Sequence, residues 1–198
     1  MTTAVKIFLV RHGETAWSLS GRHTGVSDIG LTPNGEAMAR KLEKALEGIT
    51  FAQVLTSPRL RARRTCELAG MGAQAQTEPL LAEWNYGDFE GLRTDEIRQQ
   101  RPTWDIWSDG CPGGETPLDI SRRADQVIAK LQGLKAVVIL FSHGHFGRVL
   151  AARWIGLPVA QGQHFALDPA SVSVLGFEAR HAQRRVISQW NASANSSN

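Results

Sequence analysis

Short apolar segments alternate along the chain with longer stretches in which apolar residues recur at helical spacing. Five segments are continuously apolar or alternate between apolar and polar residues, a pattern that predicts β-strands at residues 5–10, 51–56, 136–142, 171–178 and 185–190. Helical stretches separate most of these segments. The order predicts an α/β fold in which helices cover both faces of a mostly parallel sheet, as a three-layer α/β/α sandwich.

Four stretches between the strands predict helices at about residues 32–48, 57–70, 118–131 and 146–155. Thr32 is placed to cap the first helix, with Pro33 in its first turn. Pro58 is placed at the first position of the second helix, which would leave free backbone amides as an anion site.

Residues 83–116 do not follow this alternation. They contain Trp84, Trp104 and Trp107 together with a Cys-Pro-Gly-Gly sequence and several charges. We interpret this stretch as an inserted lid over one edge of the sheet, anchored by Trp104 and Trp107.

Composition and length fit one soluble globular domain. The chain has 198 residues, of which 42% are hydrophobic and 21% charged. We expect residues 1–190 to form a single domain and residues 191–198, which are small and polar, to be a disordered tail. The first apolar run is too short for a signal peptide or a membrane span, so we expect a cytoplasmic protein with no membrane partner. The two cysteines, Cys66 and Cys111, are not arranged as metal ligands, and no pattern indicates an oligomeric state.

The formal net charge is +3, and its densest cluster consists of Arg59, Arg61, Arg63 and Arg64. Aromatic residues are not interleaved with these arginines, and no nucleic-acid-binding motif is present. We therefore expect an anionic small molecule as the partner rather than nucleic acid.

The first predicted strand ends in Arg11-His12-Gly13. In open α/β folds ligands bind at the carboxyl ends of the strands, and a histidine beside a fixed positive charge suits phosphate. A neutral imidazole nitrogen can also attack phosphorus. The tripeptide alone leaves open a structural role for His12.

Two further segments carry basic residues that fit phosphate. Of the arginines that follow Pro58, we expect Arg61 to point inward and the others to form a solvated helix face, because positions two apart lie about 200° apart on a helix. The strand at 136–142 is followed by His143, which would face the phosphate. His145 is either a helix-start residue without a chemical role or a contact to the substrate.

A third segment, residues 83–91, supplies carboxylates beside aromatic side chains. An acid in such a setting can be held protonated, which suits protonation of a leaving alkoxide. The candidates are Glu83, Asp88 and Glu90, of which two are expected to be turn or surface residues. The remaining histidines, His23, His164 and His181, are expected at the surface or in structural roles.

These motifs together resemble the histidine phosphatase superfamily, also called the phosphoglycerate mutase-like family. Arg-His-Gly-Glu-Thr, Thr-Ser-Pro-x-x-Arg-Ala, Glu-x-x-Tyr-Gly-x-x-Glu-Gly and Ser-His-Gly occur in this order, and the similarity extends over nearly all of residues 5–178. The resemblance implies that His12 accepts the phosphoryl group and that Arg11, Arg61 and His143 form the phosphate pocket with it. Glu83 would be the general acid and then the base for water, with no metal or other cofactor.

The resemblance also implies contacts to the substrate. Ser18 stands where the family commonly has a phosphate-binding Asn, and Thr24-Gly25 matches its substrate loop. The substrate-binding residues that we expect are Ser18, Thr24, Gly25, Tyr86, Gly144 and His145.

Within the family the chain looks most like the sedoheptulose-1,7-bisphosphatase type, for example in Tyr86-Gly87-Asp88-x-Glu90-Gly91. The expected function is hydrolysis of a sugar phosphate or bisphosphate through a phosphohistidine intermediate. A bisphosphate would need a second cationic site, for which Arg22, His23, Arg93 and His145 are candidates. The alternatives are a phosphoglycerate mutase and a catalytically weak binding or regulatory member of the family.

Overall fold

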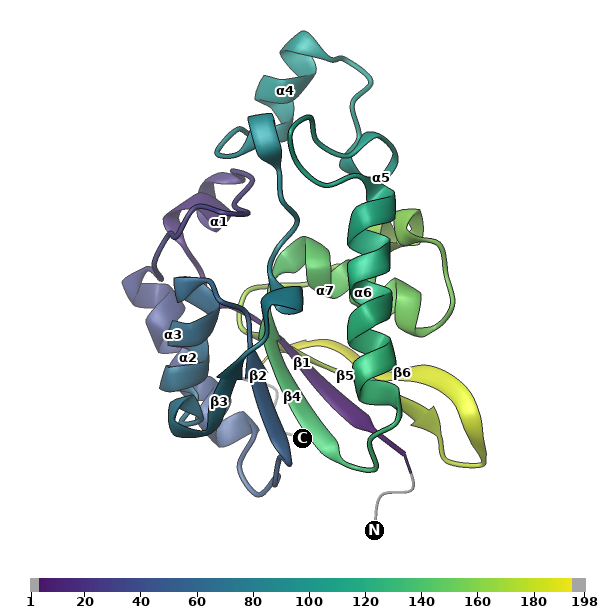
Figure 1. The fold of residues 1–198 in the computed structure, drawn as a ribbon. Coiled ribbons are helices and arrows are strands. Elements are labelled where there is room, and N and C mark those ends of the chain that lie inside the picture. Colours follow the sequence, from purple (N-terminus) through teal and green to yellow (C-terminus); the bar gives the residue numbers. More distant parts are fainter. Residues whose placement is uncertain (1–3, 194–198) are drawn as a thin grey trace.

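The computed structural model describes residues 4–193, which contain a mixed sheet of six strands (Figure 1). The strands are β1 (Lys6–Arg11), β2 (Gln53–Thr56), β3 (Ala75–Thr77), β4 (Val137–Ser142), β5 (Ser171–Glu178) and β6 (His181–Ser193). Their order is β3-β2-β4-β1-β5-β6. The pairings β3-β2, β2-β4 and β4-β1 are parallel, whereas β1-β5 and β5-β6 are antiparallel.

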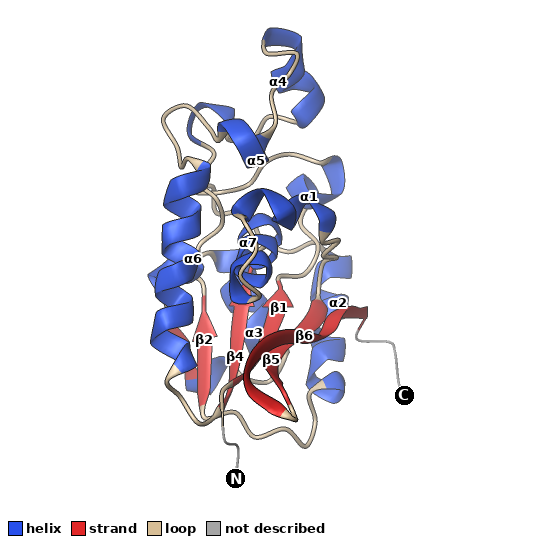
Figure 2. Cartoon of the chain, turned by 90° about the vertical axis from the view of Figure 1, so that its right-hand side faces the viewer, coloured by secondary structure: helices blue, strands red, loops and turns tan. Residues whose placement is uncertain are grey.

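Helices cover both faces of this sheet. They are α1 (Ala16–Ser20), α2 (Pro33–Ala45), α3 (Leu60–Leu68), α4 (Thr94–Gln100), α5 (Ile106–Asp109), α6 (Pro117–Gln132) and α7 (Gly144–Trp154). Helices α2 and α3 lie on one face and α6 and α7 on the other (Figures 1 and 2). The predicted three-layer α/β/α architecture is confirmed.

The apolar run of β1 is explained by its central position. Ile7 and Leu9 belong to the core cluster that includes the buried side chains of α6 and α7, whereas Phe8 and Val10 belong to the cluster of α2 and α3. Because successive side chains of a strand point to opposite faces, a strand that is buried on both faces needs apolar residues at every position.

The sequence predicts most of these elements near their observed positions, but it does not predict the short helices α1, α4 and α5. Three further differences concern β3, β6 and α3. Strand β3 was not expected, since it has three residues and only a partly buried first position. Strand β6 continues through Ser193, so the first three residues of the expected tail belong to it and Ala192 and Ser193 pair with β5, while residues 194–198 lie outside the described part. Helix α3 begins at Leu60 with Arg59 as its N-cap, so Pro58 is not at the first helical position.

The stretch 83–116 includes α4 and α5, which lie beyond the carboxyl ends of the parallel strands (Figure 1). Trp84, Trp104 and Trp107 are buried, and the rings of Trp84 and Trp107 pack edge to face with centroids 5.9 Å apart. No helix within residues 4–193 is long and apolar enough to cross a membrane.

Candidate active site

Three parallel strands deliver polar side chains to one edge of the sheet. Arg11 is the last residue of β1, Ser57 follows β2 and His143 follows β4. The backbone N–H of His12 donates to the carbonyl of Ser142 over 2.9 Å, which joins the first and last of these strand ends. A cavity of about 360 Å³ opens here, and Arg11 and His12 form part of its wall.

His12 is buried, and its contact with Gly13 shows which of its two ring nitrogens carries the proton. The Nδ1 atom lies 2.7 Å from the carbonyl oxygen of Gly13, which can only accept, so Nδ1 carries the proton. Burial, and then the positive charges of Arg61 and Arg11, hold the pKa of His12 well below its usual value. At neutral pH the ring is therefore uncharged, and its Nε2 atom holds a free electron pair.

Nitrogen donors without partners gather around His12. Within residues 4–193, the buried side-chain nitrogen atoms that lack a hydrogen-bond partner are Nε of Arg11, Arg59 and Arg61 and Nδ1 of His143. Buried polar groups are normally paired, because an unpaired one costs about 1–3 kcal/mol. A cluster of unpaired cationic donors beside a cavity is the arrangement that an anion with several oxygen atoms would satisfy.

Arg61 is fully buried and is oriented by backbone carbonyls. Its Nη1 atom donates to Ser27 over 2.9 Å, and its Nη2 atom donates to Thr24 and Gly25 over 2.7 and 3.2 Å. Burial lowers the pKa of Arg61, and Glu83 is the largest opposing influence. The guanidinium is thus fixed before any ligand arrives, and the inward position predicted for Arg61 agrees with the structure.

His143 is fixed by Ser57. The hydroxyl of Ser57 lies 2.7 Å from Nε2 of His143 and accepts the backbone N–H of Arg59 over 3.3 Å. The hydroxyl has one proton and a second lone pair, so its bond to the Arg59 N–H does not fix the tautomer of His143. We assign the hydroxyl proton to Nε2 because Nδ1 of His143, which has no partner in the described part of the chain, is then a donor to an anion. Burial, followed by Arg61 and His12, lowers the pKa of His143 well below its usual value, so this donor is neutral.

The same contacts change the expected role of Pro58. Because Ser57 is held by His143, the chain stays extended through Arg59, whose ψ is 138°, and α3 starts only at Leu60. The N–H of Leu60 then donates to Asp28 over 2.6 Å. The start of α3 is therefore not the open anion site predicted from Pro58.

Glu83 caps helix α7 from another segment. One of its carboxylate oxygens accepts the backbone N–H groups of Trp84 and Phe146 over 2.9 and 2.8 Å, and the other accepts that of His145 over 3.0 Å. His143, the N-cap residue of α7, makes no side-chain capping bond. Its imidazole is therefore left for the cavity, while Glu83 is held at the helix N-terminus.

Glycine at position 144 keeps the cavity open beside Glu83. A Cβ atom there would lie 3.4 Å from Nε of Arg11 and 3.7 Å from a carboxylate oxygen of Glu83. Arg11 and Glu83 thus face the same small space, which a side chain at position 144 would begin to fill.

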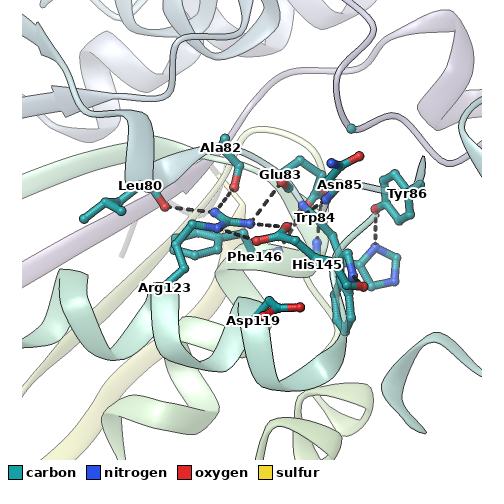
Figure 3. Close-up of polar contacts among 12 residues, drawn as sticks. Leu80, Ala82, Glu83, Trp84, Asn85, Tyr86, Asp119, Arg123, His145 and Phe146 are labelled. Atoms are coloured by element: carbon teal, nitrogen blue, oxygen red, sulfur yellow. Dashed lines mark hydrogen bonds and ion pairs between the residues drawn. The ribbon is translucent and has the colours of Figure 1, made fainter. Parts of the chain in front are cut away.

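Arg123 holds the segment that carries Glu83 (Figure 3). Its guanidinium makes two hydrogen bonds of 2.8 and 2.7 Å to the carboxylate of Glu115. It also donates to the carbonyls of Leu80, Ala82 and Glu83 over 2.9, 2.6 and 3.1 Å, and it stacks 4.6 Å from the ring of Phe146. Arg123 therefore holds the backbone that leads to Glu83 and also packs on Phe146, whose N–H binds the Glu83 carboxylate.

Neutral polar side chains also line the cavity. The hydroxyl of Tyr86 lies 2.8 Å from Nδ1 of His145, as Figure 3 shows, and Thr94 lies 3.3 Å from Nε2 of His23. Burial lowers the pKa of His23 to about 4 and that of His145 well below its usual value. Neither histidine is a cation at neutral pH, so both act as hydrogen-bonding groups.

Glu90 fixes the loop at residues 24–27. The N–H of Gly25 donates to both carboxylate oxygens of Glu90 over 2.9 and 3.0 Å, and the N–H of Ser27 donates over 2.9 Å. A Cβ at Gly25 would lie 2.4 Å from the carbonyl oxygen of Trp84, so a larger residue does not fit. Glu90 and Gly25 therefore support the loop whose carbonyls hold Arg61.

A family model for the histidine phosphatase superfamily (branch 1) matches residues 7–192. The chain belongs to the histidine phosphatase superfamily.

Two relatives that are named as phosphatases, and one solved structure of another protein, are similar to this histidine phosphatase over most of its length. An acid phosphatase from Mycobacterium tuberculosis is 43% identical over 186 residues, which cover 92% of this chain and 91% of the relative. A sedoheptulose 1,7-bisphosphatase from Saccharomyces cerevisiae is 37% identical over 78% of this chain and 69% of the relative. A solved structure from Mycobacterium tuberculosis has a TM-score of 0.88 at 38% identity and covers 96% of this chain and 98% of its own. The protein is thus a phosphatase whose family acts on phosphorylated small molecules.

The histidine phosphatase site brings together most of the residues expected from the sequence. Of the expected substrate-binding residues, the ones that line the cavity are Ser18, Thr24, Tyr86, Gly144 and His145. Gly25 does not line it and supports Arg61 instead. Ser18 lines it, but its hydroxyl donates to the carbonyl of Thr15 over 3.0 Å in the capping box of α1, so its proton is already used.

Other expectations for this histidine phosphatase need correction. Of the three candidate carboxylates, Glu83 is the one that lines the cavity, whereas Asp88 is exposed, as expected for two of the three. His23 was expected at the surface, in a structural role or as a cation of a second anion site, yet it is a neutral residue that is buried against Tyr86, with ring centroids 4.8 Å apart, and lines the cavity. Arg59 was expected on a solvated face, but its Nε is buried.

The residues that sequence reasoning missed are Arg98, Arg123 and Arg148. Arg98 and Arg148 line the cavity, and Arg123 supports Glu83. No motif marks them, although Arg148 lies one helical turn beyond Gly144, a position that faces the same side. Within residues 4–193, no group of three or more His, Cys, Asp or Glu side chains is arranged to hold a metal ion.

Proposed function

We propose that the chain is a phosphomonoesterase that hydrolyses a sugar phosphate or bisphosphate through a phosphohistidine at His12. The observation that carries this proposal is the state of His12, which is neutral, fixed at Nδ1 by Gly13, and surrounded by donors without partners. A phosphate group would satisfy those donors and present its phosphorus to Nε2 of His12.

In the first step, Nε2 of His12 forms a bond to phosphorus while the bond from phosphorus to the leaving sugar oxygen breaks. The carboxyl group of Glu83 gives its proton to that oxygen, so the sugar leaves as an alcohol. The His12 ring keeps its Nδ1 proton and becomes a phosphorylated imidazolium, whose charge the carbonyl of Gly13 stabilises. Arg11 and Arg61 balance the charge on the phosphoryl oxygens.

In the second step, the carboxylate of Glu83 takes a proton from water while the water oxygen bonds to phosphorus. The bond from phosphorus to Nε2 of His12 breaks, and phosphate leaves. His12 is again neutral with its proton on Nδ1, and Glu83 is again protonated, so the two steps return the site to its starting state.

The cavity and the relatives support a sugar phosphate as the substrate class. A volume of about 360 Å³ falls at the small end of ligand pockets, which are about 300–1,000 Å³. Neutral hydrogen-bonding groups next to His12 suit a polyhydroxylated leaving group. One relative is named a sedoheptulose 1,7-bisphosphatase, and that bisphosphate is the specific substrate that we propose.

Phosphate release from a panel of compounds tests the proposal. The panel contains sedoheptulose-1,7-bisphosphate, fructose-1,6-bisphosphate, their monophosphates, 3-phosphoglycerate and phosphoserine, and isomerisation of 3-phosphoglycerate is followed in parallel. We expect release from the sugar phosphates, with turnover lost and binding kept in His12→Ala. Isomerisation without release would instead identify a mutase, and silence across the panel would favour a binding protein.

A further inference from the structure

Arg148 is a half-buried arginine on α7 that faces the cavity. Its Nε donates to the carbonyl of Gly162 over 3.0 Å and its Nη2 to that of Gln163 over 2.8 Å. The guanidinium lies 4.7 Å from the ring centroid of Trp107. The side chain is therefore held in one orientation before any ligand is present.

No acidic residue in the described part of the chain forms an ion pair with Arg148. Burial lowers the pKa of Arg148, with Glu83 as the largest opposing influence and Arg11 as a repulsive one. A half-buried cation without a carboxylate is costly, and proteins normally pair such charges. Its location in the wall of the cavity suggests that the missing partner is a ligand.

Arg98 provides a second cation in the wall of the same cavity. It extends from α4, and its Nε donates to the carbonyl of Trp104 over 3.0 Å. Like Arg148, it has no ion pair within residues 4–193. Arg98 of α4 and Arg148 of α7 line the same cavity, together with Trp104 and Trp107.

Arg22 and Asp105 are charged groups that also line the cavity, and both are already engaged. Arg22 contacts Glu96 over 3.4 Å and donates to the carbonyl of Gly91 over 2.6 Å. Asp105 is the N-cap of α5 and accepts the N–H of Trp107. Among the candidates that the sequence suggested for a second anion site, His23 is a neutral group that lines the cavity.

Three kinds of group line the cavity. They are Arg11 beside His12, neutral side chains that include Tyr86 and His145, and the cations Arg98 and Arg148, which have no ion pair within residues 4–193. A ligand that matches this lining carries hydroxyl groups and a second anionic group in addition to the one that reacts at His12.

We propose that Arg148 and Arg98 form a second anion subsite, which binds the distal phosphate of a polyhydroxylated bisphosphate whose other phosphate reacts at His12. Arg148 is the specificity-determining residue, because its orientation is fixed by Gly162, Gln163 and Trp107. The inference rests on the proposed function, since it concerns the leaving group of the same reaction.

The test compares kcat/KM for sugar bisphosphates with kcat/KM for the matching monophosphates. We expect the native protein to prefer the bisphosphates and Arg148→Gln to lower that preference at least about tenfold, as expected for loss of a charged hydrogen bond. Arg98→Gln should lower it less, because Arg98 is exposed. Arg148→Lys should recover part of the preference.

Arg153→Gln is the matched control. Arg153 lies on the same helix but pairs with Asp125 over 2.9 Å, away from the cavity. This variant should keep the native preference, whereas an equal loss in Arg153→Gln and Arg148→Gln would overturn the proposal. Equal kcat/KM for bisphosphates and monophosphates in the native protein would overturn it as well.

Binding measurements separate this inference from the proposed function. In the His12→Ala background, calorimetry gives Kd for each sugar phosphate without turnover, and we expect Arg148→Gln to weaken only the bisphosphates. That result together with no phosphate release would refute the proposed function and leave the subsite intact. A dependence on Arg148 for 3-phosphoglycerate but not for bisphosphates would show that the subsite binds a carboxylate and would overturn the proposal.

Discussion

Arg123→Gln perturbs the contact that we regard as most important for the orientation of Glu83. The side chains of Arg123 and Glu115 are only 14% and 19% exposed, so the substitution leaves a largely buried carboxylate without its cation. Removing one partner of a buried pair costs about 3–5 kcal/mol, and the residual exposure places this case near about 3 kcal/mol. For a chain of this size, about 2–4 °C per kcal/mol predicts that Tm falls by about 6–12 °C.

The catalytic effect of Arg123→Gln should depend on the leaving group. Because Arg123 holds the carbonyls of Ala82 and Glu83, its loss should misplace the acid and slow sugar phosphates about tenfold or more. p-Nitrophenyl phosphate should be slowed much less, since its phenolate leaves without a proton. Steady-state assays on both substrates, at a temperature well below the lowered Tm, measure the two losses.

Controls make the Arg123 prediction specific. Arg122→Gln changes the preceding, exposed residue of α6 and should leave both rates unchanged. In a Glu83→Gln background, Arg123→Gln should add little to the loss on sugar phosphates, because both changes remove the same function. Equal losses on both substrates, or full additivity with Glu83→Gln, would refute the assignment of Arg123 as a positioning residue for Glu83.

Three further predictions follow from the site. Gly13→Ala should lower both Tm and kcat, because its Cβ would lie 2.5 Å from the carbonyl oxygen of Gly35. Ser57→Ala should lower kcat/KM about tenfold and shift the ¹⁵N resonances of His143, because Nε2 of His143 loses the hydroxyl that sets its tautomer. The free energy of unfolding, measured in urea, should fall as pH falls from about 6.5 to 4. In this pH range His23 binds a proton in the unfolded chain, where its pKa is about 6.5, but not in the folded protein, where its pKa is about 4. Protonation therefore favours the unfolded state, by about 3 kcal/mol for His23 at the lower end of the range. Unfolding that is independent of pH in this range would contradict the burial of a neutral His23.

The sequence predicts the sheet and the phosphate-binding end of the cavity because both depend on local patterns. A strand buried on both faces reads as an apolar run, and in a parallel sheet the residue after each run lies at a shared edge. Arg11, His12 and His143 are placed by that rule alone. Helix periodicity separates Arg61 from Arg63, since positions two apart lie about 200° apart, but it does not place Arg59, which is the N-cap of α3 and has a buried Nε.

The other end of the cavity depends on packing that no local pattern encodes. His23 becomes buried only because Tyr86 and Trp104, distant in sequence, stack around it. Arg148 faces the cavity because Gly162 and Trp107 fix its guanidinium. These contacts join segments that are separated by more than one element, so their residues look like ordinary surface positions in the sequence.

The central claim is that His12 carries the phosphoryl group during turnover. Rapid quenching of the enzyme with a ³²P-labelled sugar phosphate, followed by mass spectrometry of the labelled peptide, tests it most directly. We expect an acid-labile, base-stable label on His12, and on Nε2 rather than Nδ1, because Nδ1 is held by the carbonyl of Gly13. The label should form and decay at rates consistent with kcat. Turnover without any labelled intermediate, or a label on His143 or another residue, would contradict the account.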